Sequence, residues 1–334
     1  MELTVHLGAR SYPIFFERGI LSRIGQHVNL NRKVLIVTDT GVPRRHWQAV
    51  LDQCPQGYCE VVEMGEGAKS FPVFEHLCKK LLEYGFTRKD LVISVGGGVV
   101  GDLGGFVAAS YMRGIDFVGI PTTTLSQIDS SVGGKMAINL AGVKNIIGAF
   151  HQPKAVLIDF DTLATLPARH YANGLAEAVK MGFILDPKII ELFERDDSSC
   201  SAVMDEIIYR AIAAKAHIVE IDETEQNERK SLNFGHTIGH GIEAAGHLAD
   251  LYHGECVALG MLYFFEDEAV KQRCIRILEK LHLPTSTQVD AESVFAALSH
   301  DKKGDGKTIS VVKVPAVGQY RLEKMSYDAI RALL

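Results

Sequence analysis

Three histidines in the second half of the chain are the side chains best suited to bind a metal. His236 and His240 lie four residues apart, so they share one face of a predicted helix, and His253 begins the next motif. This spacing suits one divalent metal, and neutral imidazoles with one carboxylate make a zinc site with an open position for substrate. The glycines around the first two histidines each cost a helix roughly 1 kcal/mol, which indicates that another group approaches closely there. A single histidine is more often a hydrogen-bonded core residue, but for the three together we favour a metal site.

Two pairs of polar residues accompany the histidines. Glu177 and Lys180 stand three residues apart on a predicted helix and therefore point to one face. From this spacing alone, the favoured interpretation is a surface ion pair. Arg229 and Asn233 lie four residues apart just before the histidines and add hydrogen-bond donors suited to an anion.

A glycine-rich turn in the first half formally matches the pattern G-x-G-x-x-G through Gly96, Gly98 and Gly101. Glycines between a strand and a helix let a pyrophosphate approach the backbone and the positive end of the helix. Alone the match is weak evidence of nucleotide binding, because a glycine-rich connection between a strand and a helix is often only a tight turn. The acidic residue expected about 20 positions later is also not evident. Asp39, or Glu66 with Lys69, are then candidates to hold a ribose.

A polar cluster follows among small residues: Asp129, Lys135, Lys144 and Asn145 lie close together in the sequence. Two lysines, an amide and a carboxylate amid glycines suit a bound anion. A solvated surface loop is the usual meaning of such a composition, and the residues alone leave both interpretations open.

The composition excludes several functional classes. A net charge of −6, from 35 basic and 41 acidic residues, argues against a general binder of nucleic acid or membrane surfaces. The N-terminus alternates polar and apolar residues without the apolar core of a signal peptide, and no apolar run is long enough to span a bilayer. The six cysteines are scattered, which predicts reduced thiols in a cytoplasmic protein.

The order of predicted elements indicates two domains. Strands at Val34–Val37, Leu91–Val95, Phe117–Ile120 and Ala155–Ile158 are separated by helical patterns, including Phe71–Tyr84, which predicts a Rossmann-like parallel sheet in an α/β domain. We place the boundary near Leu166, giving an α/β domain at 1–166 and a mainly α-helical domain at 167–334. The helices expected in the second domain, before a short strand pair near Thr308–Val314, are Gly174–Phe183, Ser201–Ile221, Ser231–Ala245 and Cys256–Leu281.

Together these motifs resemble the dehydroquinate synthase family of the sugar phosphate cyclases. Seven stretches match in family order: Gly96–Gly114, Pro121–Lys135, Lys144–Pro153, Gly174–Lys180, Glu228–Glu243, His253–Met261 and His300–Lys303. One match could be accidental, but seven in order are not. The resemblance implies a homodimer in which NAD, a divalent metal (zinc or cobalt) and a sugar phosphate substrate occupy a cleft between an NAD-binding α/β domain and a helical metal- and substrate-binding domain.

The resemblance also implies roles for individual residues. The metal ligands become Glu177, His236 and His253, which leaves His240 to a phosphate contact and proton transfer. Arg113 would reach the phosphate of the neighbouring subunit's substrate. Implied NAD contacts are Asp39, Glu66, Lys69, Gly98, Val99, Asp102, Thr122, Thr123, Lys135, Lys144, Thr162 and Thr165. Implied substrate contacts are Asp129, Lys135, Asn145, Lys180, Lys215, Arg229, Asn233, His240 and Lys303, with Lys302 as the alternative to the last.

The implied reaction converts 3-deoxy-D-arabino-heptulosonate 7-phosphate to 3-dehydroquinate and phosphate, as a phosphate-eliminating lyase of the shikimate pathway to the aromatic amino acids. NAD oxidises a hydroxyl and later returns the hydride, so it acts as a catalyst. Two other readings remain: a related cyclase acting on a sugar phosphate without a carboxylate, and a metal-dependent polyol dehydrogenase. Lys215 and Arg229 favour a carboxylated substrate, and the implied phosphate contacts disfavour the dehydrogenase.

Overall fold

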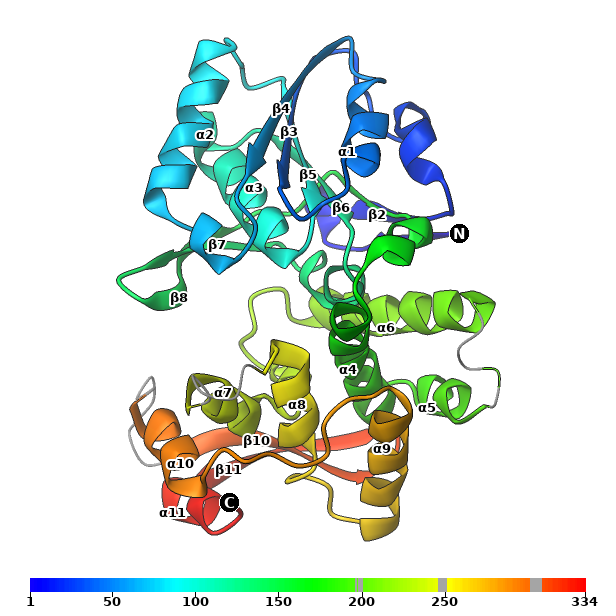
Figure 1. The fold of residues 1–334 in the computed structure, drawn as a ribbon, viewed down its shortest axis with the longest axis vertical. Helices are drawn as coiled ribbons and strands as arrows, with labels where there is room; N and C mark the ends of the chain where they lie inside the picture. The colour runs from blue at the N-terminus through cyan, green and yellow to red at the C-terminus, as the bar shows by residue number, and fades with distance from the viewer. Residues whose placement is uncertain (196, 198–200, 246–250, 301–307) are drawn as a thin grey trace. The chain divides into compact units, whose positions relative to one another are not determined.

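The computed structural model describes the whole chain except residues 196, 198–200, 246–250 and 301–307 (Figure 1). The chain divides into two compact units, which we call unit 1 (Met1–Pro167) and unit 2 (Ala168–Leu334).

Unit 1 contains a seven-stranded sheet in the order β1-β2-β9-β6-β5-β3-β4. All neighbouring strands are parallel except β1 and β2, which pair antiparallel at the edge. The expected strands are present, and the sheet has the predicted parallel, Rossmann-like character. The strands are β1 (Glu2–Val5), β2 (Tyr12–Phe16), β3 (Lys33–Asp39), β4 (Gln56–Val62), β5 (Leu91–Gly96), β6 (Asp116–Pro121) and β9 (Ala155–Ile158).

Helices cover both faces of this sheet. Leu77 of α2 (Phe71–Glu83) and Leu103 of α3 (Gly98–Ser110) belong to one apolar core, together with strand residues Leu35 and Val92. On the opposite face, α1 (Arg44–Leu51) and the 3-10 segment η2 (Ile20–Gln26) pack with Ile36 and Ile93. All six residues of β5 are buried, as expected for a parallel strand covered on both faces.

The polar cluster of the first half is not a loop. β7 (Lys135–Leu140) and β8 (Val143–Phe150) form a separate antiparallel hairpin, and β8 is exposed along almost its whole length. The tight turn at Ala141 and Gly142, both with positive φ, reverses the chain. Of the two interpretations left open, a surface loop does not describe the backbone of these residues, although the side chains of Lys135, Lys144 and Asn145 are exposed.

Unit 2 is mainly helical, as predicted, and is built around α4 (Ala168–Ile184), whose residues from Asn173 to Ile184 are all buried. The strands β10 (Thr308–Ala316) and β11 (Gln319–Ser326) form an antiparallel pair, which lies below α7 and α8 in Figure 1. The other elements are α5 (Pro187–Glu194), α6 (Ser201–Ile221), η7 (Glu228–Asn233), α7 (His236–Ala245), α8 (His253–Met261), α9 (Glu268–Lys280), α10 (Ala291–His300) and α11 (Tyr327–Arg331).

Two of the expected helices are interrupted. The predicted helix Ser231–Ala245 is split into η7 and α7, because Gly235 has a φ of 78° that ends one segment before the next begins. The predicted helix Cys256–Leu281 is split into α8 and α9. There, Phe265 pairs with Val314 as an isolated bridge, and the side chain of Asp267 accepts a hydrogen bond from Val270 N as the cap of α9.

Candidate active site

The glycines near His236 and His240 predicted that another group approaches closely. At Gly239 this group is the neighbouring helix α8. A Cβ atom added to Gly239 of α7 would lie 2.8 Å from the carbonyl oxygen of Cys256, and one added to Gly260 of α8 would lie 2.0 Å from that of Gly235. Side chains at these positions would force the two helices apart. The glycines therefore let the backbones of α7 and α8 pack directly against each other, which brings His236 and His253 together from separate helices.

The first turn of α8 is also attached to α4. Gly254 N donates to Oδ1 of Asn173 at 2.7 Å, and a Cβ added to Gly254 would collide with the Asn173 carbonyl. The carboxylate of Glu255 caps the helix by accepting from Tyr252 N at 2.8 Å and binds the guanidinium of Arg169 through two bonds of 2.7 and 2.8 Å. These contacts hold His253, the first residue of α8, close to Glu177 on α4.

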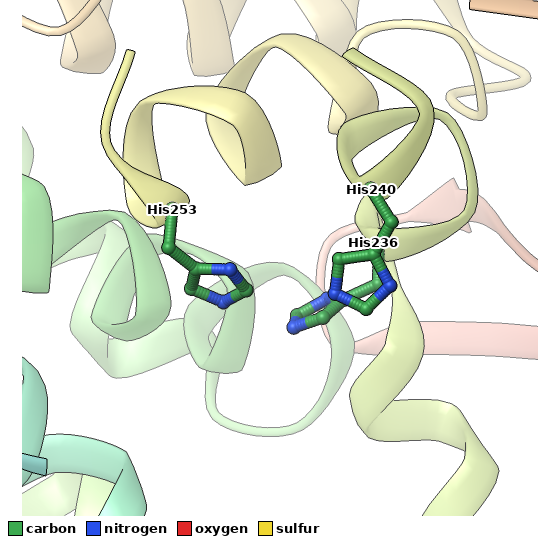
Figure 2. A group of neighbouring side chains, drawn as sticks. All are labelled: His236, His240 and His253. Carbon is green, nitrogen blue, oxygen red and sulfur yellow. The ribbon is translucent and has the colours of Figure 1, made fainter. Parts of the chain in front are cut away.

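The three histidines form one cluster (Figure 2). His236 and His240 extend from α7 and His253 from α8, and their rings converge on a common space. One nitrogen from each ring lies within 4.8 Å of the other two. The three histidines that the sequence analysis grouped as candidate ligands therefore lie together in the structure.

Glu177 completes this cluster from α4. Its side chain is only 1% exposed, and Oε1 lies 3.6 Å from Nε2 of both His236 and His253. These distances are too long for hydrogen bonds, and they are close to the roughly 3.3 Å that separates two ligands of one tetrahedral ion with bonds near 2.05 Å. Within the described part of the chain, the buried Oε1 atom of Glu177 accepts no hydrogen bond, which fits a divalent cation as its partner.

Lys180 forms an ion pair with the other oxygen of Glu177, and its side chain is 2% exposed. The surface ion pair that the spacing favoured was therefore wrong, because both residues lie on the buried α4. Burial by itself would raise the pKa of Glu177, but Lys180, His236 and His253 hold it well below its usual range. The carboxylate is ionised and available as a ligand at neutral pH.

The two imidazoles next to Glu177 differ in protonation. Burial, together with the charge of Lys180, lowers the pKa of His236 to about 3, so this ring is neutral. Burial alone would also lower the pKa of His253, but the carboxylates of Glu177 and Glu243 raise it to about 9. A metal bound at His253 must therefore displace a proton.

Arg229 and Lys215 are buried cations rather than solvated charges, with relative exposures of 3% and 5%. The turn before η7 is organised by Asp222, whose carboxylate accepts from Gln226 N at 2.9 Å, Asn227 N at 2.6 Å and Arg229 N at 3.1 Å. Asn233 Nδ2 donates to Oε1 of Glu225 at 3.1 Å. Lys303, and its neighbour Lys302, lie outside the described residues.

In unit 1, the glycine-rich turn has the strand–turn–helix geometry that the motif requires. β5 ends at Gly96 and α3 begins at Gly98, with nothing but Gly97 between them. Thr122 N donates to Gly96 O at 2.9 Å, and a Cβ at Gly97 would lie 3.2 Å from the methyl of Thr123. The turn and the threonines that follow β6 therefore lie at the same sheet edge.

Asp39 is the last residue of β3, the strand next to β5. Val37 pairs with Ser94, so two residues further along each strand Asp39 is level with Gly96. Burial raises the pKa of Asp39, although its carboxylate accepts from Gly41 N at 2.8 Å. A cavity of about 380 Å³ beside it is lined by Asp39, Thr40, Gly41, Val42, Pro43, Arg44, Trp47 and Val61.

Four further predicted residues form one polar network. Lys69 is buried, donates to Asp102 Oδ2 at 2.6 Å and to Asn145 Oδ1, and has Glu66 Oε1 3.5 Å away. Asn139 connects them, because its side chain donates to Glu66 Oε1 at 2.8 Å and accepts from Asn145 N at 2.8 Å. Residues that are up to 79 positions apart thus meet at one place in unit 1.

The other predicted residues of unit 1 are dispersed. Thr165 is partly buried and donates to the carbonyl of Thr162 at 2.9 Å in the 3-10 segment η6 (Phe160–Thr165). Arg113 is exposed in a turn with a φ of 70°. Gly98 and Val99 open α3, Asp129 lies in the π-helical segment η5 (Ser126–Ser130), Lys135 begins β7 and Lys144 is in β8.

Three residues in these networks were missed by the sequence analysis: Asn139, Glu225 and Glu243. Asn139 and Glu225 carry no local spacing signal, although Glu225 has a φ of 62°, an uncommon conformation for glutamate. Glu243 does carry a signal, because it follows His236 by seven residues and His240 by three and therefore lies on the same face of α7.

Comparison with known proteins identifies the chain. The fold is that of the sugar phosphate cyclases. The structure of 2-deoxy-scyllo-inosose synthase complexed with carbaglucose-6-phosphate, NAD+ and Co2+ superposes on this chain with a TM-score of 0.88 at 24% identity. The match covers 100% of this chain and 99% of that one. The 2-epi-5-epi-valiolone synthase from Streptomyces hygroscopicus subsp. jinggangensis 5008, with NAD+ and Zn2+ bound, gives a TM-score of 0.86 at 27% identity, covering 96% and 95%.

Comparison of the sequence assigns the chain to a narrower family than comparison of the fold does. Residues 59–173 match the family described as 3-dehydroquinate synthase N-terminal, and residues 174–304 match 3-dehydroquinate synthase C-terminal. The 3-dehydroquinate synthase of Thermoanaerobacter pseudethanolicus (strain ATCC 33223 / 39E) is 39% identical over 99% of both chains. The chain belongs to the 3-dehydroquinate synthase family.

Proposed function

We propose that this enzyme converts 3-deoxy-D-arabino-heptulosonate 7-phosphate to 3-dehydroquinate and phosphate. The observation that supports this most strongly is the buried Glu177 carboxylate with Oε1 at 3.6 Å from Nε2 of both His236 and His253, in a chain matched to the family over nearly its whole length. A carboxylate, a neutral imidazole and a second imidazole form a ligand set suited to zinc or cobalt.

Glu177, His236 and His253 would hold one divalent metal, which when bound supplies a Lewis acid that lowers the pKa of a substrate hydroxyl. In unit 1, the turn Gly96–Gly98 with Asp39, Lys69, Thr122 and the other assigned contacts would bind NAD, which supplies reversible hydride acceptance. The residues fit both groups, because Glu177 Oε1 accepts no hydrogen bond from the residues that the structure describes, and the all-glycine turn has no side chains to obstruct a pyrophosphate.

Within unit 2, Lys180 neutralises part of the charge of Glu177 and keeps that carboxylate ionised in a buried site. We assign Arg229 and Lys215 to the substrate carboxylate, because both are cations buried by the fold and a buried cation is best used against an anion. Asn233 and the exposed His240 are assigned to the phosphate, with His240 also placed to move a proton.

Within unit 1, we assign Lys135 and Asn145 to the phosphate and Asp129 to a substrate hydroxyl. The phosphate can act as the base in its own elimination, so these residues need only orient it. The exposed Arg113 is assigned to the substrate of a second copy of the chain, which makes a homodimer part of the proposal. The conversion itself would run through oxidation, elimination of phosphate, reduction and an aldol closure, and the hydride taken at the start is returned.

Two rival functions fit the assigned contacts less well. A cyclase acting on a sugar phosphate without a carboxylate would make no use of the buried cations Arg229 and Lys215 against its substrate, and a polyol dehydrogenase would make no use of the phosphate contacts. Within the described residues, every helix is too short or too polar to span a lipid bilayer. We propose that the enzyme works in the cytoplasm, in the shikimate pathway to the aromatic amino acids.

Release of phosphate from a set of substrates tests this function. The purified enzyme with NAD and Zn2+ or Co2+ is given heptulosonate 7-phosphate or glucose 6-phosphate. We expect rapid phosphate release from the carboxylated substrate and little from the other. Preferential release from glucose 6-phosphate would instead assign the chain to a different cyclase reaction.

A further inference from the structure

Glu243 lies on the face of α7 that carries the histidines. It follows His236 by seven residues and His240 by three, and both spacings return to the same side of a helix. Its Oε2 atom is 3.1 Å from Nδ1 of His253, the ring that extends from α8 toward the other two histidines in Figure 2. The contact therefore connects α7 to the ring that faces Glu177 from the neighbouring helix.

The Nδ1 atoms of the two candidate ligands have different acceptors. His236 Nδ1 lies 3.1 Å from the carbonyl oxygen of Phe234, a neutral acceptor, whereas His253 Nδ1 faces a carboxylate. In each ring, donation from Nδ1 leaves the lone pair on Nε2, and both Nε2 atoms face Glu177 Oε1 at 3.6 Å. The hydrogen bond at His236 thus leaves Nε2 of that neutral ring free to bind, and the one at His253 keeps the remaining proton on Nδ1 once a metal has displaced the proton on Nε2.

We propose that Glu243 is a positioning residue that holds His253 in the orientation and tautomer required of a metal ligand and strengthens it as a donor. This inference rests on the proposed function, because it assumes that the cluster binds a divalent metal. A carboxylate behind a histidine makes the imidazole more basic and fixes its plane, and losing such a partner typically weakens metal affinity about 10–100-fold.

The two rings obtain their acceptors from different parts of the fold. His236 is 14% exposed and begins α7 two residues after Phe234, so the adjacent chain supplies its acceptor. His253 is 32% exposed and begins α8. The acceptor for its Nδ1 atom comes from the neighbouring helix α7, through Glu243, which is itself 25% exposed.

The test compares metal affinity in Glu243→Ala, Glu243→Gln and the unchanged protein at one pH, using Zn2+ in competition with a chromophoric chelator. Glu194→Gln is the control, because Glu194 holds Arg273 through an ion pair of 2.7 Å with no connection to the histidines. We expect the alanine variant to lose about 10–100-fold in affinity. The glutamine variant keeps an oxygen acceptor and should recover part of that loss, while the control should match the unchanged protein.

The absorption spectrum of the Co2+-loaded protein gives a second measurement, which reports the ligands directly and does not depend on turnover. We expect a shifted or weakened visible band in the alanine variant and none in the control. Equal affinities and equal spectra in all four proteins would overturn the role of Glu243 while leaving the metal site in place. Failure of the unchanged protein to bind either ion would overturn the metal assignment and this inference with it. If the alanine variant does not fold, a glutamine variant with unaltered affinity would suffice to reject the proposal.

Discussion

The burial of Glu177 beside Lys180 indicates a functional rather than a stabilising role for this ion pair. A carboxylate that is 1% exposed beside a lysine that is 2% exposed carries a large desolvation cost, and such pairs are often no more stabilising than apolar residues of the same size. The pair is therefore difficult to explain by stability alone. Binding one divalent cation together with the Nε2 atoms of His236 and His253 would give the buried carboxylate a functional reason to be there.

We expect His236→Ala to lose its metal and its turnover while the fold remains intact, because one of three ligands from separate elements is removed. Metal content per chain and circular dichroism should be measured together with phosphate release. His217→Ala, a change at an exposed histidine of α6, serves as the control and should retain both metal and activity. Full activity in metal-stripped His236→Ala would refute the ligand assignment.

Arg229 is expected to distinguish carboxylated from other substrates. Arg229→Ala should lose about 2–5 kcal/mol in transition-state stabilisation on heptulosonate phosphate, because a buried carboxylate loses its charged partner. Lys230→Ala, which removes the neighbouring cation, should change kcat/KM little. Comparison of kcat/KM on a sugar phosphate without a carboxylate completes the test, since equal losses on the two substrates would show that Arg229 does not bind the carboxylate.

The sequence identified most of these side chains but not their burial. Glu177 and Lys180 have the spacing of an exposed ion pair, and an i, i+3 spacing is the same whether the face meets water or a core. Whether Glu177 and Lys180 are exposed or buried is decided only by the packing of α4, which is buried from Asn173 to Ile184. The contact between Glu243 and His253 was likewise invisible, because it depends on how closely two helices approach.

The crossing of α7 and α8 depends on glycines that admit no side chain. Gly260→Ala would place a Cβ atom 2.0 Å from the carbonyl oxygen of Gly235, a backbone atom that cannot move aside cheaply. We expect this substitution to destabilise the fold by about 3 kcal/mol and to weaken metal binding by separating His236 from His253. Thermal or urea unfolding measures the first effect, and chelator competition measures the second.

Gly101→Ala in α3 is the matched control, because no atom lies within 4 Å of a Cβ added there. An alanine in this helix should change stability by no more than about 1 kcal/mol, in the favourable direction. If Gly260→Ala proved as stable as this control, the proposed close packing of α7 on α8 would be incorrect.

The turn before η7 should make stability depend on acid pH. Burial acts to raise the pKa of Asp222, but the N–H donors of Gln226, Asn227 and Arg229 lower it overall. A depressed carboxyl pKa adds stability that is fully present above its unfolded value of about 3.9 and is lost as pH falls through the folded pKa. Asp222→Asn should therefore be less stable by about 1.5–3 kcal/mol at neutral pH.

Urea unfolding of both proteins across acid pH checks this expectation, and the two curves should converge below the pKa of the carboxyl. A difference that stays constant down to the most acidic pH would show that the charge of Asp222 is not responsible.

The sequence predicted the strands of unit 1 better than the bounds of the helices of unit 2. The buried strands of unit 1 were found because runs such as Leu91–Val95 are β-rich and bounded by turn residues. The two long helices of unit 2 were joined incorrectly. Gly235 and Asp267 interrupt patterns that are otherwise helical. Gly235 does so through its positive φ, and Asp267 does so as the N-cap of α9. The spacing of hydrophobic residues reports neither feature.

Considered as a whole, the chain divides its functional groups between two compact units. Unit 1 carries the glycine-rich turn with the network of Lys69, and unit 2 carries Glu177 with the histidines. The matched families follow the same division, with one ending at residue 173 and the other beginning at 174. Neither group alone defines the reaction, and the proposed chemistry needs a reversible oxidant as well as a metal.

The use of NAD is the most direct test of that chemistry. One reaction, with NAD far below the substrate concentration and a saturating divalent metal, should be followed for phosphate, 3-dehydroquinate and NADH together. Because the hydride is returned in each turnover, phosphate and 3-dehydroquinate should rise in equal amounts until the heptulosonate phosphate is exhausted, with no net NADH. A reaction that stops after one equivalent of NAD, with NADH accumulating in proportion to product, would contradict this account and point to a dehydrogenase.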